Sequence, residues 1–513
     1  MNPNSRTITL ALWAICFGVA CGRLYDARTA FDEPDRPDGN SGHTSIDFGG
    51  QWMMGRQVVL GHERELYHRD RHWQLAWATY PREDEPPDRR KNAFPKHLRD
   101  ADRGPKEIRH DAEQMMYWFM GDDSPRWKDA AVAVGVQFLQ DAFVPNPFSR
   151  AIFEDLAKKR LTPEAIVELE RPAIGGPLYP PIHGFLYAPL ALDPEPRSAY
   201  RTFQILSILL TFVAGGGLSA ITRGRIAWPL ATLAVMLFPG YQAGLQLGQN
   251  HVLTLAILAW GWAFAVRSRD SLGGAIWGVL AFKPVWGAAF FLLPLLQRRW
   301  RFCGAMVLVG GGMCVATLPV VGIETWFEWL AVGKEASATY EVNENWIHLS
   351  RDLGGIPRRA MVDFRLPEPD RTNPRASQIG WAFWLVVFTL TVGTCHLRGD
   401  RRFRTGLGAG FLSLGAYLTC YRFIFYDAVL ALVPLAILFA DPRIVLRRGI
   451  AWPAVRFPLF VVGLLFAIEN WLKNYAGASS LNTPWDTVLL LSLWAWCGWR
   501  LVRYGDRGEL SAA

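Results

Sequence analysis

The chain is poor in charged residues, which narrows the class of protein it can be. Only 19% of its 513 residues are charged, whereas 50% are apolar and 13% are aromatic; an average soluble domain has about 25% charged residues. A disordered chain would need few aromatic residues and a high net charge, so this class is excluded. There are also only seven cysteines, with none in residues 26–199 and no Cys-x-x-Cys pair. A disulfide framework in that segment and a cysteine metal site are therefore excluded as well.

Several sequence signatures of soluble enzymes and pumps are missing. The chain has no Gly-x-x-x-x-Gly-Lys-Ser/Thr loop, no Gly-x-Gly-x-x-Gly, no His-Glu-x-x-His and no Gly-x-Ser-x-Gly. An ATP-driven pump and a hydrolase of soluble fold are thus unsupported. His62, His68 and His72 lie near one another in sequence, but no cysteine accompanies them, so we predict no metal and no cofactor. No internal repeat is evident, which argues against a secondary transporter.

Charge is distributed unevenly along the chain. Residues 26–199 hold 23 Lys/Arg and 29 Asp/Glu, a net charge of −6, and the remainder holds 31 and 17, a net charge of +14. The basic residues of the remainder form short clusters between apolar runs. This pattern follows the positive-inside rule of membrane proteins, so we expect contacts with membrane lipids and no nucleic-acid partner.

The apolar runs predict an all-α integral membrane protein with about ten crossings and both termini in the cytoplasm. Most runs approach the roughly 17–25 residues that cross a bilayer. They cover residues 7–22, 203–221, 226–247, 251–266, 302–323, 379–397, 405–420, 424–440, 457–472 and 485–501. A further run, 273–296, has arginines on both sides and contains Lys283-Pro284. We therefore interpret it as a re-entrant hairpin broken at the proline.

This topology divides the chain into five parts. A first transmembrane helix (1–25) precedes a large, largely helical external loop (26–199), and transmembrane helices with the hairpin follow (200–323). A second external loop (324–378) and C-terminal transmembrane helices (379–513) complete the chain. Trp127 to Phe143 shows helical spacing of apolar residues, and Tyr80 to Pro105 is rich in proline and charge, as in an exposed loop.

Two candidate residues lie in the first external loop. Asp47 follows the first span, and partial desolvation at the membrane surface could tune its carboxylate as a base; the alternative is an ordinary solvated acid. Tyr179 opens Tyr179-Pro180-Pro181 before the second span. Consecutive prolines fix an extended entry to the membrane, and a rigid connector with an aromatic belt is the alternative role.

Five more candidates lie inside or between the later runs. The amides of Gln249 and Asn250 could bind hydroxyl or phosphate groups, or could form a capping turn. Lys283 is the only lysine inside an apolar run; such a cation faces a cavity or a partner, or snorkels to the surface. His348 and Arg351 lie in the second external loop, where Arg351 could hold a phosphate or belong to an ordinary polar loop.

In order, these motifs resemble those of a known enzyme family. They are Asp-Phe after the first span, Gly-x-x-x-x-Leu-Tyr at 61–67, Tyr-Pro-Pro at 179–181, Gly-Gln-Asn at 248–250, and Lys-Pro at 283–284 followed by Arg-Arg-Trp-Arg at 298–301. The sequence resembles the polyprenol-phosphate-mannose-dependent glycosyltransferases of family 87 in the GT-C superfamily. About 110 residues separate Tyr67 from Tyr179, more than this family's pattern leads us to expect.

The resemblance implies an inverting hexosyltransferase, most simply a mannosyltransferase of the cell (inner) membrane with its site on the external or periplasmic side. Its donor would be a sugar on a polyprenyl phosphate, and its acceptor the hydroxyl of a lipid or glycan. Asp47 matches the family's acid in the first external loop, the general base. Gln249, Asn250 and Lys283 match further motif positions, while His348 and Arg351 are the nearest match to an Asn-x-Ser element.

Two other functions stay open at this point. A lipid-linked sugar transporter or flippase would share the helical bundle and the cations, but it would not need Asp47. A scaffold that binds a partner through residues 26–199 would lose its function when residues 80–165 are deleted.

Overall fold

The computed structural model describes residues 3–30, 47–68, 71, 75, 178–366, 370–398, 404–440, 452–468 and 484–504. Over these residues the chain is all-helical, and no strand occurs among them. The predicted patterns at 80–105 and 127–143 lie outside the described residues. The chain divides into two compact units, each described by itself below. Unit 1 comprises residues 1–28, 203–316 and 337–513, and unit 2 comprises residues 29–202 and 317–336.

In unit 1, the N-terminal helix packs against the first part of the bundle. Helix α1 (Pro3–Ala30) places Trp13 against Phe212 of α10 (Pro196–Ile221) and against Trp228 at the start of α11 (Trp228–Leu237), with ring centroids 6.0 and 5.4 Å apart. Near the other end of α1, Gln204 donates a hydrogen bond of 2.8 Å to the carbonyl of Ala27. Gln242 Nε2 also donates to the carbonyl of Arg23 at 3.2 Å. Aromatic contacts and polar bonds thus hold the helix against the bundle along its length.

The run at 226–247, predicted as one span, forms two helices. Helices α11 and α12 (Tyr241–Leu247) meet at an angle of 71°. The break falls at Phe238-Pro239-Gly240, where Gly240 has φ +83° and lies so close to the carbonyl oxygen of Phe425 that a Cβ would clash with it. Glycine can adopt the positive φ and leaves room for the Phe425 carbonyl, because it has no Cβ. Pro239 cannot continue the first helix and ends it.

The predicted break at Lys283-Pro284 is present. Helix α13 (His251–Val266) is followed by α14 (Asp270–Gly278), the 3₁₀ turn η4 (Val279–Phe282) and α15 (Pro284–Leu296). Lys283 has the non-helical angles φ −135° and ψ 69°, and Pro284 opens the next helix, a position that suits its missing donor. The structure therefore confirms the interruption, and the re-entrant course through a membrane stays a prediction.

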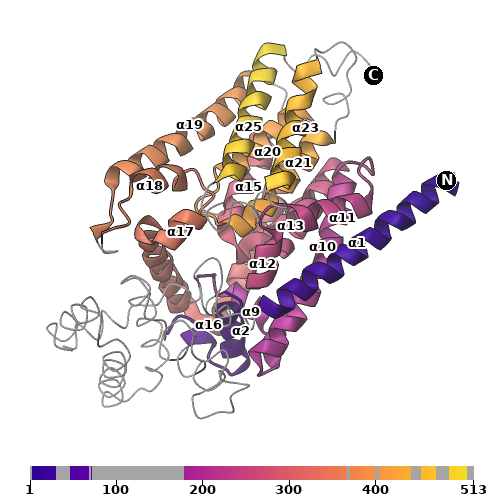
Figure 1. Cartoon of the computed structure of the whole chain (residues 1–513). Coiled ribbons are helices and arrows are strands. Elements are labelled where there is room, and N and C mark those ends of the chain that lie inside the picture. Colours follow the sequence, from indigo (N-terminus) through magenta and orange to yellow (C-terminus); the bar gives the residue numbers. More distant parts are fainter. Residues whose placement is uncertain are drawn as a thin grey trace, which may run out of the picture. The chain divides into compact units, whose positions relative to one another are not determined.

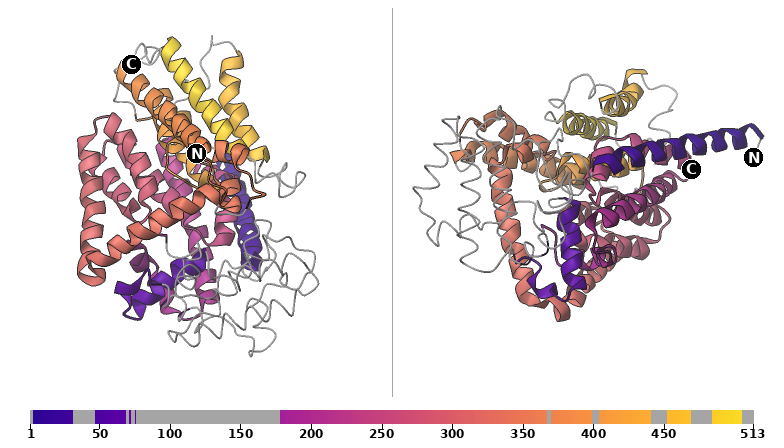
Figure 2. Two further views of the ribbon diagram at one scale, coloured as in Figure 1. Left: turned by 90° about the vertical axis from the view of Figure 1, so that its left-hand side faces the viewer. Right: turned by 60° about the horizontal axis from the view of Figure 1, so that its bottom comes forward.

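Helix α20 is the centre of the second part of unit 1. Helix α20 contacts α15, α19, α21 and α25, and α25 also contacts α23 (Figures 1 and 2). The bounds of these elements are α17 Glu344–Leu349, α18 Gly355–Met361, α19 Pro374–Arg398, α20 Leu407–Leu418, η6 Phe425–Ala431, α21 Leu432–Phe439, α23 Trp452–Ala467 and α25 Trp485–Tyr504.

The predicted external loop at 324–378 contains helix. Helix α16 (Trp300–Val342) continues past the expected end of its span at residue 323, through a kink at Gly322, which has φ +81°. These backbone angles are non-helical, so α16 consists of two helical stretches that meet at Gly322, where glycine tolerates the positive φ. Helices α17 and α18 occupy more of the same segment.

Unit 2 is built on two helices in backbone contact. Helix α2 (Phe48–Val59) packs against α9 (Ile182–Tyr187), and the 3₁₀ turns η1 (Glu63–Glu65) and η3 (Leu190–Leu192) flank them. A Cβ on Gly55 would lie 2.6 Å from the carbonyl carbon of Tyr187. The close approach of α2 and α9 therefore requires glycine at this position.

The helices that could cross a membrane number four among the described residues. They lie at Arg6–Arg28, Pro196–Ile221, Trp300–Val342 and Pro374–His396, and the bent pair α11–α12 makes a fifth if it counts as one span. These lengths support an all-helical membrane protein. The total of about ten crossings stays a prediction.

Candidate functional site

Asp47 lies at the start of α2 in unit 2. It occupies the N-cap position, and its carbonyl oxygen accepts hydrogen bonds from the backbone N–H of Gln51 at 3.4 Å and from Gln51 Nε2 at 3.2 Å. The side chain is half-buried. The first turn of the helix thus holds the backbone of Asp47. This fixes the position of the Cα atom from which the carboxylate side chain extends.

Gln51 connects Asp47 to the Tyr-Pro-Pro segment. Its Oε1 lies 3.0 Å from Nε2 of His183 in α9, and both side chains are buried. Because Gln51 Nε2 donates to Asp47, Oε1 acts as the acceptor, and we assign the ring proton of His183 to Nε2. The imidazole stacks between the rings of Tyr179 and Tyr187, at centroid distances of 4.0 and 4.6 Å.

Tyr179 is tied to the Gly-x-x-x-x-Leu-Tyr motif. The Tyr67 hydroxyl donates a hydrogen bond of 2.6 Å to the carbonyl of Tyr179, and Leu66 is completely buried. Burial, and secondarily the charge of Glu328, raise the pKa of Tyr67 well above its usual value, so the hydroxyl remains a donor at neutral pH. Unit 2 therefore brings together three motifs that are scattered over residues 47–181.

In unit 1, Lys283 has a carboxylate partner. Its Nζ lies 2.7 Å from Oδ1 of Asp427, and Trp286 Nε1 donates to Oδ2 of the same carboxylate at 3.1 Å. Lys283 is 6% exposed and Asp427 is 3% exposed. The snorkelling alternative for Lys283 is therefore wrong, because the ammonium is buried against a partner. A phosphate that approached this ammonium would compete with Asp427 for it.

Gln249 and Asn250 form the turn between α12 and α13. Gly248, with φ +65°, ends α12, and Asn250 occupies the N-cap position of α13, where its side chain makes no capping hydrogen bond. Both amide side chains are buried. The carbonyl of Gln249 accepts a hydrogen bond from Nδ1 of His251 at 3.0 Å, so the turn is fixed by the residue that follows the motif.

His251 is a residue that the motif analysis missed. It is fully buried, its ring covers Gly244 so closely that a Cβ there would clash, and Nε2 has no hydrogen-bond partner within the described part of the chain. Since Nδ1 carries the proton toward Gln249, Nε2 is a buried acceptor. The available signal was a histidine directly after Gly-Gln-Asn at the start of an apolar run.

Arg351 is engaged in a local network. Its Nε donates to Asp486 at 2.9 Å, and Nη1 points at the carbonyls of His348, Leu349 and Ser350 at 3.0–3.3 Å. His348 is 25% exposed and lies 4.0 Å from Glu344. A bidentate contact between Arg351 and a phosphate would have to displace either Asp486 from Nε or the backbone carbonyls from Nη1.

Arg359 is a second cation at this turn that the sequence analysis did not single out. Its Nη2 donates to the carbonyl of His348 at 3.0 Å and to that of Ser350. Burial, followed by the positive charge of Arg351, lowers the pKa of Arg359 to about 9. The guanidinium therefore still carries its charge at neutral pH.

The candidates of unit 1 converge on the segment 423–427. Leu247, Leu349 and Phe425 belong to one hydrophobic cluster, and they lie within two residues of Gln249, His348 and Asp427 respectively. The backbone N–H of Arg351 also donates to the carbonyl of Phe423 at 2.9 Å. The structure thus groups Gln249, Asn250, Lys283, His348 and Arg351 in unit 1, and Asp47 and Tyr179 in unit 2.

Comparison with known proteins agrees with the motif analysis. The model of glycosyltransferase family 87 matches residues 178–421, a range that includes Tyr179, Gln249, Asn250, Lys283, His348 and Arg351 but neither Asp47 nor Asp427. No curated protein and no solved structure matches the chain. Residues 178–421 are thus similar to glycosyltransferase family 87, as the motifs predicted, and this match indicates a membrane glycosyltransferase.

Proposed function

We propose that this glycosyltransferase moves a hexose, most simply mannose, from a polyprenyl phosphate to a hydroxyl of a lipid or glycan on the external face of the cell membrane. The family match supports glycosyl transfer by a membrane protein. The donor, the identity of the sugar and the side of the membrane go beyond this match and are proposed here.

In the proposed reaction Asp47 is the general base. Its carboxylate takes the proton of the acceptor hydroxyl, whose oxygen attacks the anomeric carbon from the face opposite the phosphate. The new glycosidic bond forms as the bond between the anomeric carbon and the phosphate oxygen breaks, and polyprenyl phosphate leaves with the electron pair. The configuration inverts, and the stable phosphate leaving group makes a general acid unnecessary.

The observation that carries this assignment is the link from Asp47 through Gln51 to His183. It joins the acid to the helix that the Tyr-Pro-Pro motif starts, and this helix lies inside the range matched by the family. The buried bond between Gln51 and His183 holds the first turn of α2 in place. A general base needs a backbone held in this way, because its carboxylate must lie in a defined position relative to the substrate.

The test is transfer of label from a radiolabelled polyprenyl-phosphate mannose to candidate lipid acceptors by the purified protein. We expect Asp47→Asn to lower the transfer rate by about 10²–10⁴-fold, the usual contribution of a general base. Asp193→Asn is the matched control, because Asp193 lies in the same unit and, among the described residues, its carboxylate accepts a hydrogen bond only from the backbone N–H of Glu195. Transfer by Asp47→Asn at the rate of the control would remove Asp47 as the base.

The same assay separates the enzyme from a flippase. A flippase would move the labelled carrier lipid across a vesicle membrane without forming a new glycosidic bond, and Asp47→Asn would leave that movement unchanged. Labelled product with inverted configuration at the anomeric carbon is the result that the proposal expects.

A further inference from the structure

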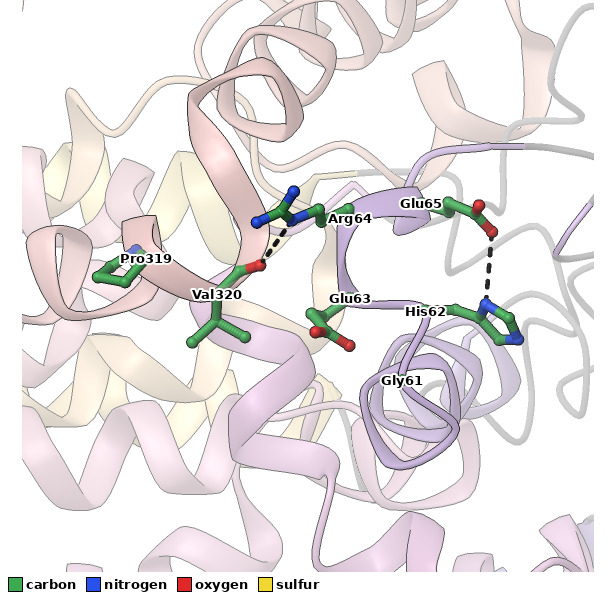
Figure 3. Close-up of a pocket in the computed structure, with 7 residues that line it drawn as sticks. All are labelled: Gly61, His62, Glu63, Arg64, Glu65, Pro319 and Val320. Atoms are coloured by element: carbon green, nitrogen blue, oxygen red, sulfur yellow. Dashed lines mark hydrogen bonds and ion pairs between the residues drawn. The ribbon is translucent and has the colours of Figure 1, made fainter.

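A cavity of about 590 Å³ lies within unit 2, between the turn that follows α2 and two residues of α16 (Figure 3). Its volume falls within the roughly 300–1,000 Å³ of small-molecule sites. It is lined by Gly61, His62, Glu63, Arg64, Glu65, Pro319 and Val320. Five of these seven residues belong to the Gly-x-x-x-x-Leu-Tyr motif.

The backbone of the turn explains why the motif begins with glycine. Gly61 has φ +79°, its N–H donates to the carbonyl of Val58 at 3.2 Å, and the N–H of His62 donates to that of Gln57 at 2.8 Å. These two bonds make a Schellman motif, which ends α2 and turns the chain. Nothing lies within 4 Å of a Cβ built on Gly61, so the backbone angle, and not the space, requires glycine.

Both ends of the turn are anchored. Leu66 packs with Met54 and Val321 in a buried cluster, and the Thr325 hydroxyl donates to the carbonyl of Arg64 at 3.1 Å. Arg64 in turn donates from Nε to the carbonyl of Val320 at 3.3 Å. The cavity wall is therefore held on both sides before any ligand arrives.

Some polar side chains of the cavity wall have hydrogen-bond or ion-pair partners among the described residues, and others have none. Glu65 lies 2.5 Å from Arg71 and 3.6 Å from His62, and Figure 3 shows His62 and Glu65 meeting while Arg64 reaches Val320. Glu63 makes no hydrogen bond or ion pair with any residue that the structure describes. The two Nη groups of Arg64 likewise have none within the described ranges. A carboxylate and a pair of guanidinium donors that have no partner among the described residues thus line one cavity.

We propose that this pocket binds the saccharide part of the acceptor. The inference rests on the proposed function, since the bound saccharide is an acceptor only if the protein transfers a sugar to it. A carboxylate accepts hydrogen bonds from sugar hydroxyls, and a guanidinium donates to their oxygens, so a hydroxyl-rich ring satisfies Glu63 and Arg64 at once. An apolar ligand would leave both groups unpaired. With two glutamates against one arginine, the net charge of the wall disfavours a phosphate. Among the described residues, no group of three His, Cys, Asp or Glu side chains could hold a metal ion.

Saturation-transfer NMR on the purified full-length protein tests the pocket directly. The probes are methyl α-mannoside, methyl α-glucoside and an α-linked mannose disaccharide, each tested alone. We expect at least one probe to bind, and we expect Glu63→Gln and Arg64→Gln each to weaken that binding by about ten-fold or more, as for hydrogen bonds to charged groups. Glu324→Gln, an exposed acid of α16 outside the pocket, should bind like the wild type.

Two results would overturn the proposal that this pocket binds a saccharide. One is the absence of a signal for every probe, and the other is equal binding by the wild type and Glu63→Gln. Thermal unfolding of each variant shows that it is folded, and Arg64→Gln supplies an independent test if Glu63→Gln fails to fold.

The design also separates this inference from the proposed function. Asp47→Asn should keep saccharide binding while it loses transfer. If the wild type binds sugar through Glu63 yet transfers none, the proposed function fails and the pocket stands. If transfer occurs while Glu63→Gln leaves the KM for the acceptor unchanged, the pocket fails and the function stands.

Discussion

The buried pair of Lys283 and Asp427 makes a sharp stability prediction. Lys283→Met would leave the carboxylate of Asp427 buried, with the N–H of Trp286 as its one remaining side-chain donor among the described residues. Asp427→Asn would leave the ammonium of Lys283 buried beside the Tyr426 ring, 5.7 Å away. In each single variant, one charge loses its partner in surroundings that exclude water. The double variant Lys283→Met/Asp427→Asn contains no buried charge, and the asparagine oxygen can still accept from Trp286.

The magnitudes follow from these environments. Removal of one member of a buried ion pair costs about 3–5 kcal/mol, whereas replacement of the whole pair by uncharged groups is often nearly neutral. We therefore expect each single variant to lose about 3–5 kcal/mol of unfolding free energy. The double variant should lose less unfolding free energy than either single variant, because it contains no unpaired buried charge.

Denaturant unfolding of the purified protein in detergent micelles measures these differences. Glu328→Gln is the control, because it breaks the exposed pair of His68 and Glu328, whose side chains are 51% and 36% exposed; such pairs contribute about 0–1 kcal/mol. A double variant whose loss equals the sum of the two single losses would refute the reasoning, since it would show that Lys283 and Asp427 act independently.

Two further predictions concern packing and the Arg351 network. Gly55→Ala should destabilise the protein by about 1–3 kcal/mol in the same unfolding assay, because the new methyl group meets the Tyr187 backbone at 2.6 Å; Gly18→Ala, where a Cβ meets nothing within 4 Å, should be neutral or stabilising. Arg351→Lys should lower the unfolding free energy by about 1–3 kcal/mol, because an ammonium cannot span Asp486 and the carbonyls around residue 350. An unfolding midpoint for Arg351→Lys equal to that of the exposed Arg365→Lys would contradict this reasoning.

Local signals in the sequence predicted a good part of this fold. The Lys283-Pro284 break follows from the chemistry of proline alone, and the apolar runs located most of the long helices. The bend at residues 238–240 was missed because the run 226–247 looks continuous in hydropathy. Its sharpness depends on Gly240 meeting the carbonyl of Phe425, a contact between residues distant in the sequence.

The candidate site was predictable to the same degree. The cost of a buried lysine implied a partner for Lys283, but the sequence could not select Asp427, which lies 144 residues away. Among 46 acidic residues, only tertiary packing makes that choice. Likewise the motifs pointed to Tyr179 and Asp47, whereas the connecting residues Gln51 and His183 belong to no motif and emerged only from the geometry.

The family match begins at residue 178, so the motif segment that contains Asp47 lies outside it. The structure nevertheless folds residues 47–68 together with the first matched residues. The Tyr67 hydroxyl bonds the carbonyl of Tyr179, Phe48 lies 5.3 Å from the ring of Tyr200, and Gly55 admits the backbone of α9. The long stretch between Tyr67 and Tyr179 therefore separates two pieces of one structural unit, and the acid and the Tyr-Pro-Pro helix are best tested as parts of a single site.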